Sequence, residues 1–118
     1  MKTILIVDDG DLILQMLQVA LERAGYYVAT ASNGREGLDR VSELHPELVI
    51  CDLVMPVMGG REMYRALQAH PRYKSIPVIL MSAIEQQPLE DVPFLVKPFT
   101  MPDMLQLVAE QIGTTDRT

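Results

Sequence analysis

The sequence of 118 residues is long enough for one globular domain, and 48% of its residues are hydrophobic. Its formal net charge of -6 argues against direct nucleic-acid binding, which needs a basic face to neutralise phosphates. The one cysteine, Cys51, allows neither an internal disulfide nor a cysteine-based metal site, and its apolar neighbours predict an inert core thiol. No apolar run approaches membrane-spanning length, and the first is too short and too acidic for a signal peptide, so we expect a cytoplasmic protein without membrane insertion.

Short apolar segments alternate with segments of helical periodicity along the chain. Continuous apolar runs predict strands, and apolar residues that recur every three or four positions predict helices. In chain order, the predicted elements are a strand at 4–7, a helix at 11–24, a strand at 27–31, a helix at 33–44, a strand at 48–51, a helix around 63–67, strands at 76–81 and 94–96, and a helix at 103–112. The first helix is expected to bury one face, formed by Ile13, Met16, Leu17, Ala20 and Leu21.

Strands that alternate with helices imply parallel pairing through right-handed crossovers, and hence a doubly wound α/β fold. We expect this domain to span residues 1–113 and a disordered polar tail to occupy residues 114–118. In an open parallel sheet of this kind, ligands bind at the carboxyl ends of the strands. The candidate functional residues are therefore those that follow each strand.

Polar side chains follow four of the predicted strands at this edge. Asp8 and Asp9 follow the first strand, Asp52 the third, Ser82 the fourth and Lys97 the fifth. Taken singly, each has an ordinary explanation, because aspartates and serines often cap helices or turns and lysines are usually solvated. Their joint placement brings carboxylates, a hydroxyl and an ammonium group to one edge, and this combination predicts a functional site.

The chemistry of these groups fits phosphoryl transfer. Neighbouring carboxylates repel one another, which raises their pKa values, and a hard cation with oxygen ligands such as Mg²⁺ relieves the repulsion. The cation and Lys97 can together neutralise an incoming phosphoryl group. A carboxylate nucleophile, with Asp52 as the best candidate, then gives an acyl phosphate.

Four segments resemble, in order, the hallmarks of receiver domains of bacterial two-component response regulators. They are 4–9 (ILIVDD), 52–60 (DLVMP followed by two glycines), 81–83 (MSA) and 94–99 (FLVKPF). The match extends from about residue 2 to residue 112. The resemblance implies a flavodoxin-like, five-stranded parallel sheet in the order 2-1-3-4-5.

The resemblance also implies roles for the acidic residues. Asp52 would accept a phosphoryl group from a phosphohistidine on a sensor histidine kinase or a histidine phosphotransfer protein. Asp9 and Asp52 would ligate Mg²⁺ directly, Asp8 would do so through water, and the backbone carbonyl of Val54 would be a further ligand. Such a domain catalyses only its own phosphorylation and dephosphorylation, so we do not expect an enzyme that acts on other molecules.

Three further residues have roles by the same resemblance. Lys97 would pair with the phosphoryl oxygens and would be joined to Pro98 by a cis peptide bond. Ser82 would move to hydrogen-bond the phosphoryl group while Phe94 turns inward. These two residues would form the switch that signals to an unidentified downstream target.

The chain departs from the family pattern in three places. The segment between Ser82 and Lys97 is about two helical turns shorter than usual, so we expect the fourth helix to be short or absent and the partner-binding surface to be altered. Gly10 is expected to loosen the loop after the acidic pair. Val54 and Ile84 are apolar where polar residues are common. Neither can hold a hydrolytic water, so we predict that the acyl phosphate is lost slowly.

Other functions are compatible with parts of the sequence. The segment 9–12 (DGDL) resembles the signature of haloacid-dehalogenase-type phosphatases, in which Asp9 would be the nucleophile, but this leaves the segment 52–56 unexplained. A receiver-like binding module that is not phosphorylated is the second alternative, motivated by the shortened fourth helix. Nucleotide or flavin binding is disfavoured, because no glycine-rich phosphate loop follows the first strand.

Overall fold

The fold is a five-stranded parallel sheet in a computed structural model that describes residues 1–83, 89 and 91–113. The strand order is β2-β1-β3-β4-β5. The elements in chain order are β1 (Thr3–Val7), α1 (Asp11–Arg23), β2 (Tyr27–Ala31), α2 (Gly34–Leu44), β3 (Leu48–Asp52), α3 (Gly60–Gln68), β4 (Val78–Ser82), β5 (Phe94–Val96) and α4 (Met101–Ile112). The predicted doubly wound fold and its strand order are therefore confirmed.

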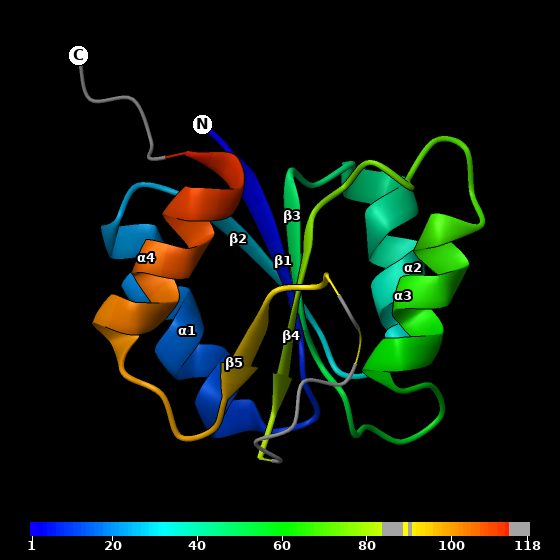
Figure 1. Cartoon of the computed structure of the whole chain (residues 1–118). Coiled ribbons are helices and arrows are strands. Elements are labelled where there is room, and N and C mark those ends of the chain that lie inside the picture. Colours follow the sequence, from blue (N-terminus) through cyan, green and yellow to red (C-terminus); the bar gives the residue numbers. More distant parts are fainter. Residues whose placement is uncertain (84–88, 90, 114–118) are drawn as a thin grey trace.

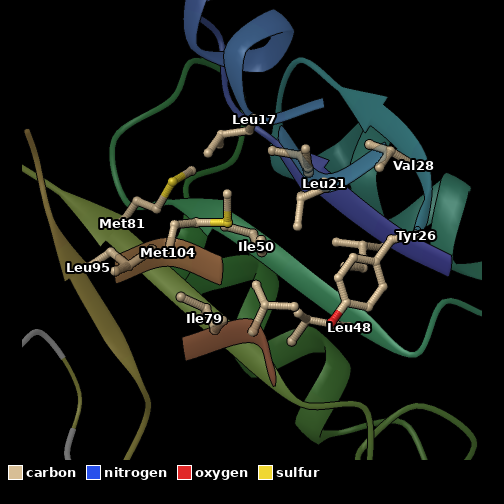
Figure 2. Packing of buried hydrophobic residues seen from close by; sticks show 13 residues of the cluster. Leu17, Leu21, Tyr26, Val28, Leu48, Ile50, Ile79, Met81, Leu95 and Met104 are labelled. Atoms are coloured by element: carbon tan, nitrogen blue, oxygen red, sulfur yellow. The ribbon is translucent and has the colours of Figure 1, made fainter. Parts of the chain in front are cut away.

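Helices cover both faces of the sheet. α1 and α4 lie on one side and α2 and α3 on the other (Figure 1). On the first side, Leu17 and Leu21 of α1 and Met104 of α4 pack against Ile50 and Met81 of the sheet (Figure 2). The central strands β3 and β4 are buried at every position, as expected for strands covered on both faces. The helices thus enclose both faces of the sheet.

The register of the sheet aligns the ends of its strands. Asp52 lies opposite Met81 and Ser82 lies opposite Val96. Asp52 and Ser82 are the last residues of β3 and β4 rather than the first residues after them. The ladder continues past β5, because the Lys97 N–H donates to the Ser82 backbone oxygen at 2.7 Å. The carboxyl ends of the strands lie at the lower edge of the sheet in Figure 1.

The connection between β4 and β5 differs from the other crossovers. Its described residues, 83, 89 and 91–93, form no helix. The described part of the chain therefore contains four helices, in agreement with the predicted loss or shortening of the fourth helix of the family. Ile84 and the predicted tail at 114–118 lie outside the described residues.

The starts of β4 and α4 each differ from the prediction by two residues for local reasons. β4 begins at Val78 because Pro77 has no N–H to donate to the ladder. α4 begins two residues early because the Thr100 side chain caps it, accepting a hydrogen bond from the Asp103 N–H. Within the described residues, no helix has both the length and the apolar character needed to cross a membrane.

Candidate functional site

Three carboxylates meet at the edge of the sheet where β1 and β3 end. Asp8 follows β1 and Asp52 ends β3, and only 2% and 7% of their surfaces are exposed. Asp9 is exposed. One carboxylate oxygen from each of the three lies within 4.8 Å of the others. The predicted acidic cluster is therefore present, with two buried members and one that faces solvent.

Backbone groups hold Asp8 in place. The Asp8 N–H donates to the Ala31 oxygen at the end of β2 (3.1 Å), and Asp8 Oδ1 accepts a hydrogen bond from the Gly10 N–H (2.8 Å). Gly10 is the N-cap of α1, with a φ of -95° that any residue can adopt. The Gly10 N–H therefore ties the start of α1 to the Asp8 carboxylate.

Lys97 joins the fifth strand to the acidic cluster. Its Nζ donates to Asp8 Oδ2 at 2.9 Å and lies 3.2 Å from Asp52 Oδ1. The peptide bond between Lys97 and Pro98 is cis, as predicted. One ammonium group thus bridges the two buried carboxylates.

Burial has the largest influence on ionisation at this site. Burial raises the pKa of Asp52 above its ordinary value, Lys97 opposes this, and the charges of Asp8 and Asp9 raise the pKa of Asp52 further. Burial alone would lower the pKa of Lys97, but its hydrogen bond to Asp8 and the two carboxylate charges raise it overall. Repulsion by the other two carboxylates, the cause expected from the sequence, raises the pKa of Asp52 less than burial does.

Ser82 and Phe94 occupy different parts of the sheet. Ser82 is buried at the end of β4, at the same edge as Asp52. Phe94 is half-buried at the start of β5, opposite Leu80, and packs on the side of α2 and α3. The structure thus brings Ser82 to the edge of the site and places Phe94 farther up the sheet.

Backbone hydrogen bonds tie the loop after β3 to β4 and to the start of α3. Its first N–H, from Leu53, donates to the Met81 oxygen at 2.9 Å, and the Gly60 N–H at the start of α3 donates back to the Leu53 oxygen at 3.0 Å. A Cβ atom at Gly60 would collide with the Asp52 carbonyl oxygen, so this closure requires glycine. Val54, the predicted carbonyl ligand, lies in this loop with its side chain 73% exposed.

Cys51 precedes Asp52 but belongs to the core. Its side chain is buried, and its Sγ lies 3.7 Å from the Met63 sulfur. Burial raises the pKa of the Cys51 thiol, and the charges of Asp52 and Asp8 add to this effect. These surroundings match the predicted inert thiol.

An apolar surface beside the site was not predicted. The α1–α4 apolar surface is a groove of about 560 Å³ lined mainly by apolar residues, among them Leu12, Met16, Val19, Met101 and Leu105. Leu12 is 71% and Met16 49% exposed, although Met16 was assigned to the buried face of α1. The sequence signal was a second apolar stripe, because Leu12, Met16 and Val19 recur at helical spacing.

This surface extends to the acidic cluster. A second hollow of about 410 Å³ shares Met16 and Met101 with the groove and is also lined by Ala83, Lys97 and Phe99. Lys97 also contacts the two buried carboxylates. The α1–α4 apolar surface and the acidic cluster are therefore neighbouring parts of one face.

The arrangement does not favour Asp9 as a nucleophile. Asp9 is exposed, and Asp11, the second aspartate of the phosphatase-like segment, lies exposed in the first turn of α1 outside the acidic cluster. Asp8 and Asp52 are the two buried carboxylates beside Lys97, and of these two Asp52 is the more exposed and is itself the last residue of a strand.

Comparison with known proteins agrees with this fold and site. The family model described as "Response regulator receiver domain" matches residues 4–109. The chain therefore belongs to the response regulator receiver domain family. It is 32% identical over 126 residues to the DNA-binding dual master transcriptional regulator RpaA of Synechocystis sp., which covers 99% of this chain and 52% of RpaA. The chain thus spans about half the length of that relative.

Solved structures of similar length share the fold. The chemotaxis protein CheY4 of Vibrio cholerae is 32% identical with a TM-score of 0.87, covering 95% of this chain and 99% of CheY4. The response regulator protein TrrA of Thermotoga maritima, solved in complex with Mg²⁺ and BeF, is 29% identical with a TM-score of 0.85, covering 95% of this chain and all of TrrA (100%). The chain is therefore a signalling domain of two-component systems.

Proposed function

We propose that this receiver domain is a phosphorylation switch in which Asp52 accepts a phosphoryl group in a Mg²⁺-dependent reaction. The observation that carries the proposal is the position of Asp52. It lies buried at the end of a central strand, 3.2 Å from Lys97 Nζ and within the cluster of three carboxylates. A buried carboxylate beside a cation is suited to attack phosphorus, because the cation neutralises the negative charge of the phosphoryl group during transfer.

The donor set fits Mg²⁺. Asp8, Asp9 and Asp52 offer hard oxygen ligands within 4.8 Å of one another, and the exposure of Asp9 leaves room for the water ligands that Mg²⁺ usually keeps. We propose Asp9, Asp52 and the Val54 carbonyl as direct ligands and Asp8 as a ligand through water. When bound, the ion would neutralise negative charge on the carboxylates and on the phosphoryl group.

The residues of the chain would act on the phosphoryl group as follows. An Asp52 carboxylate oxygen forms a bond to phosphorus while the bond from phosphorus to the donor histidine nitrogen breaks, and the imidazole keeps the electron pair. Lys97 then exchanges its contact with Asp52 for the new phosphoryl oxygens. Ser82 at the neighbouring strand end donates a hydrogen bond to the phosphoryl group, and Phe94 follows this shift as the second residue of the switch.

The phosphodonor would be a sensor histidine kinase or a histidine phosphotransfer protein. The α1–α4 apolar surface supports this proposal, because exposed apolar residues next to a reactive site mark a protein-docking face. A protein seated there would bring its phosphohistidine to the cluster edge. The downstream target is unidentified, and the domain itself is proposed to act on no substrate other than its own phosphoryl group.

We further propose that residues 1–113 form the working unit in the cytoplasm, and that this unit does not bind nucleic acid directly. A net charge of -6 supports the last point, since a basic face is needed to hold phosphates. RpaA, whose name describes a DNA-binding protein, is about twice as long as the segment matched here.

The decisive experiment is incubation with acetyl phosphate, followed by mass measurement of the intact protein. Wild type should gain one phosphoryl group with Mg²⁺ and none with EDTA, and Asp52→Asn should gain none in either case. Beryllofluoride should shift the NMR signals of Ser82 and Phe94 in wild type. A folded wild type that binds Mg²⁺ but takes up neither group would instead be a non-catalytic binding module. Labelling of Asp9 would support the phosphatase alternative.

A further inference from the structure

The loop after β3 rests on the first turn of α2. The Gly34 N–H donates to the Met58 backbone oxygen at 2.8 Å. A Cβ atom at Gly34 would lie 2.7 Å from the same oxygen and 2.8 Å from Met58 Cγ. Glycine is therefore needed at this position because two backbones approach closely there.

Hydrogen bonds to the Asn33 and Glu36 side chains hold the first turn of α2 in place. Asn33 Oδ1 accepts a hydrogen bond from the Glu36 N–H (2.9 Å), and the Glu36 carboxylate accepts one from the Ser32 N–H (3.2 Å). The first N–H groups of a helix have no partner within the helix. The Gly34 N–H donates to the loop and not to a capping side chain. The start of α2 therefore holds the Met58 carbonyl in position.

The loop contains a strained turn just before this support. The Met58 N–H donates to the Pro56 oxygen at 2.7 Å and closes a three-residue turn around Val57, whose φ is 69°. β-branched residues rarely adopt this conformation, and turns of this kind are strained. Strained backbone persists only where the surrounding structure holds it. The bond from Gly34 holds one end of the strained segment, and the Gly60 bond to Leu53 holds the other.

We propose that Gly34 is a positioning residue for the phosphorylation site. Its bond to Met58 holds the loop so that the Val54 carbonyl and Asp52 are aligned for Mg²⁺. This inference rests on the proposed function. It adds α2 to the elements that set Mg²⁺ affinity, although α2 contributes no side chain to the acidic cluster. Groups that orient metal ligands from outside the ligand set typically change metal affinity by tenfold or more when they are altered.

The test is the Mg²⁺ dissociation constant of Gly34→Ala, measured by calorimetry, with urea unfolding in EDTA as the measure of stability. The added Cβ displaces the Met58 carbonyl, so we expect Mg²⁺ to bind about tenfold more weakly than to wild type. Amide signals of residues 53–55, 57 and 58 should shift in NMR spectra. Mg²⁺ binding equal to wild type in a folded Gly34→Ala protein would overturn the proposal.

Gly37→Ala is the matched control on the same helix. Its Cβ would meet the Met63 side chain at 2.8 Å and would leave the loop backbone untouched. We expect Gly37→Ala to lower stability in EDTA and to keep its Mg²⁺ affinity within about twofold of wild type. An equal loss of Mg²⁺ affinity in both variants would mean that general destabilisation, and not positioning, is responsible.

The double variant Gly34→Ala/Met58→Ala separates backbone from side chain. It removes the Met58 side chain from the contact and leaves the carbonyl oxygen, so we expect Mg²⁺ binding to stay weak. Full recovery would overturn the assignment to the Met58 carbonyl.

Wild type supplies a test that does not depend on any variant folding. If the Gly34 bond and Mg²⁺ binding are coupled, Mg²⁺ must in turn stabilise the bond. Saturating Mg²⁺ should slow hydrogen exchange of the Gly34 N–H by about tenfold. Exchange of the Gly37 N–H, which donates to the Asn33 oxygen, should change less. No slowing at Gly34 would contradict the proposal. Failure of wild type to bind Mg²⁺ at all would refute the proposed function instead.

Discussion

Lys97 is bonded more closely to Asp8 than to Asp52, at 2.9 Å against 3.2 Å. The side chain that follows β5 therefore reaches past the ends of β4 and β3 to the residue after β1. This bridge stabilises two buried carboxylates before any cation or phosphoryl group arrives. It also means that Lys97 competes with a cation for the same oxygens.

Removing this bridge should lower stability in the absence of divalent cations. We expect Lys97→Met to lower the free energy of unfolding in EDTA by about 2 kcal/mol, because two buried carboxylates lose their hydrogen-bonded cation. Mg²⁺ should restore much of the loss, measured by urea unfolding with and without the ion. Lys74→Met, at an exposed lysine, is the control and should match wild type. A Lys97→Met protein as stable as wild type in EDTA would contradict this.

The ionised Asp52 carboxylate should lower the free energy of unfolding at neutral pH. An acid whose folded-state pKa is raised binds its proton more tightly when folded, so stability falls as the pH rises from 3.8 through the folded-state pKa. We expect Asp52→Asn to raise the free energy of unfolding in EDTA at pH 7 by about 1 kcal/mol. The gain should vanish below about pH 3.8, where Asp52 is protonated in both states.

Exposed Asp39 provides the control for this pH dependence. At each pH between 3 and 7, the unfolding free energy of Asp39→Asn should lie within about 0.5 kcal/mol of that of wild type. If Asp52→Asn were less stable than wild type at pH 7, the ion pair with Lys97 would outweigh the cost of burial.

The exposed side chain of Val54 should slow the loss of phosphate from Asp52. Val54 cannot hydrogen-bond a hydrolytic water, whereas Val54→Asn can hold one, so we expect dephosphorylation to accelerate roughly fivefold. The rate is measured by mass after removal of acetyl phosphate. Val54→Ala should behave like wild type. Loss of phosphate from Val54→Asn at the wild-type rate would disprove the explanation.

Val57 should be a site where the fold gains stability by substitution. It is 80% exposed and has a φ of 69°, which Asn tolerates far better than a β-branched residue. We expect Val57→Asn to raise the free energy of unfolding by about 1 kcal/mol. Val54→Asn makes the same exchange in the same loop without a positive φ, so its stability should stay within about 0.5 kcal/mol of wild type. Equal effects of the two changes would argue against strain at Val57.

The α1–α4 apolar surface should matter for a protein donor and not for a small one. We expect Met16→Glu to reduce the rate of transfer from a histidine-phosphorylated kinase or phosphotransfer protein by about tenfold, because it places a charge in an apolar contact. The rate with acetyl phosphate should not change. Tyr27→Glu alters an exposed apolar residue of β2 away from this surface and should leave both rates unchanged. Equal rates for Met16→Glu and wild type with the protein donor would place the docking face elsewhere.

The architecture was readable from the sequence because its signals are local. Continuous apolar runs marked the strands, and the residues after them had to share one edge once the strands were parallel. That reasoning places Asp8, Asp9, Asp52, Ser82 and Lys97 at this edge from the sequence alone. The strand order and the cis bond before Pro98 came from the family resemblance, and both are confirmed.

Relations between distant backbones were decided only in the tertiary structure. Which carboxylate Lys97 prefers depends on how far β5 lies from β1, and the exposure of Met16 depends on where α4 packs against α1. Neither distance is encoded in a local pattern. The contact of Gly34 with Met58 is of the same kind, because it requires the first turn of α2 and the loop after β3 to meet within hydrogen-bond distance. The sequence by itself determined which groups reach the edge of the sheet, and the packing of helices and loops determined how they are held there.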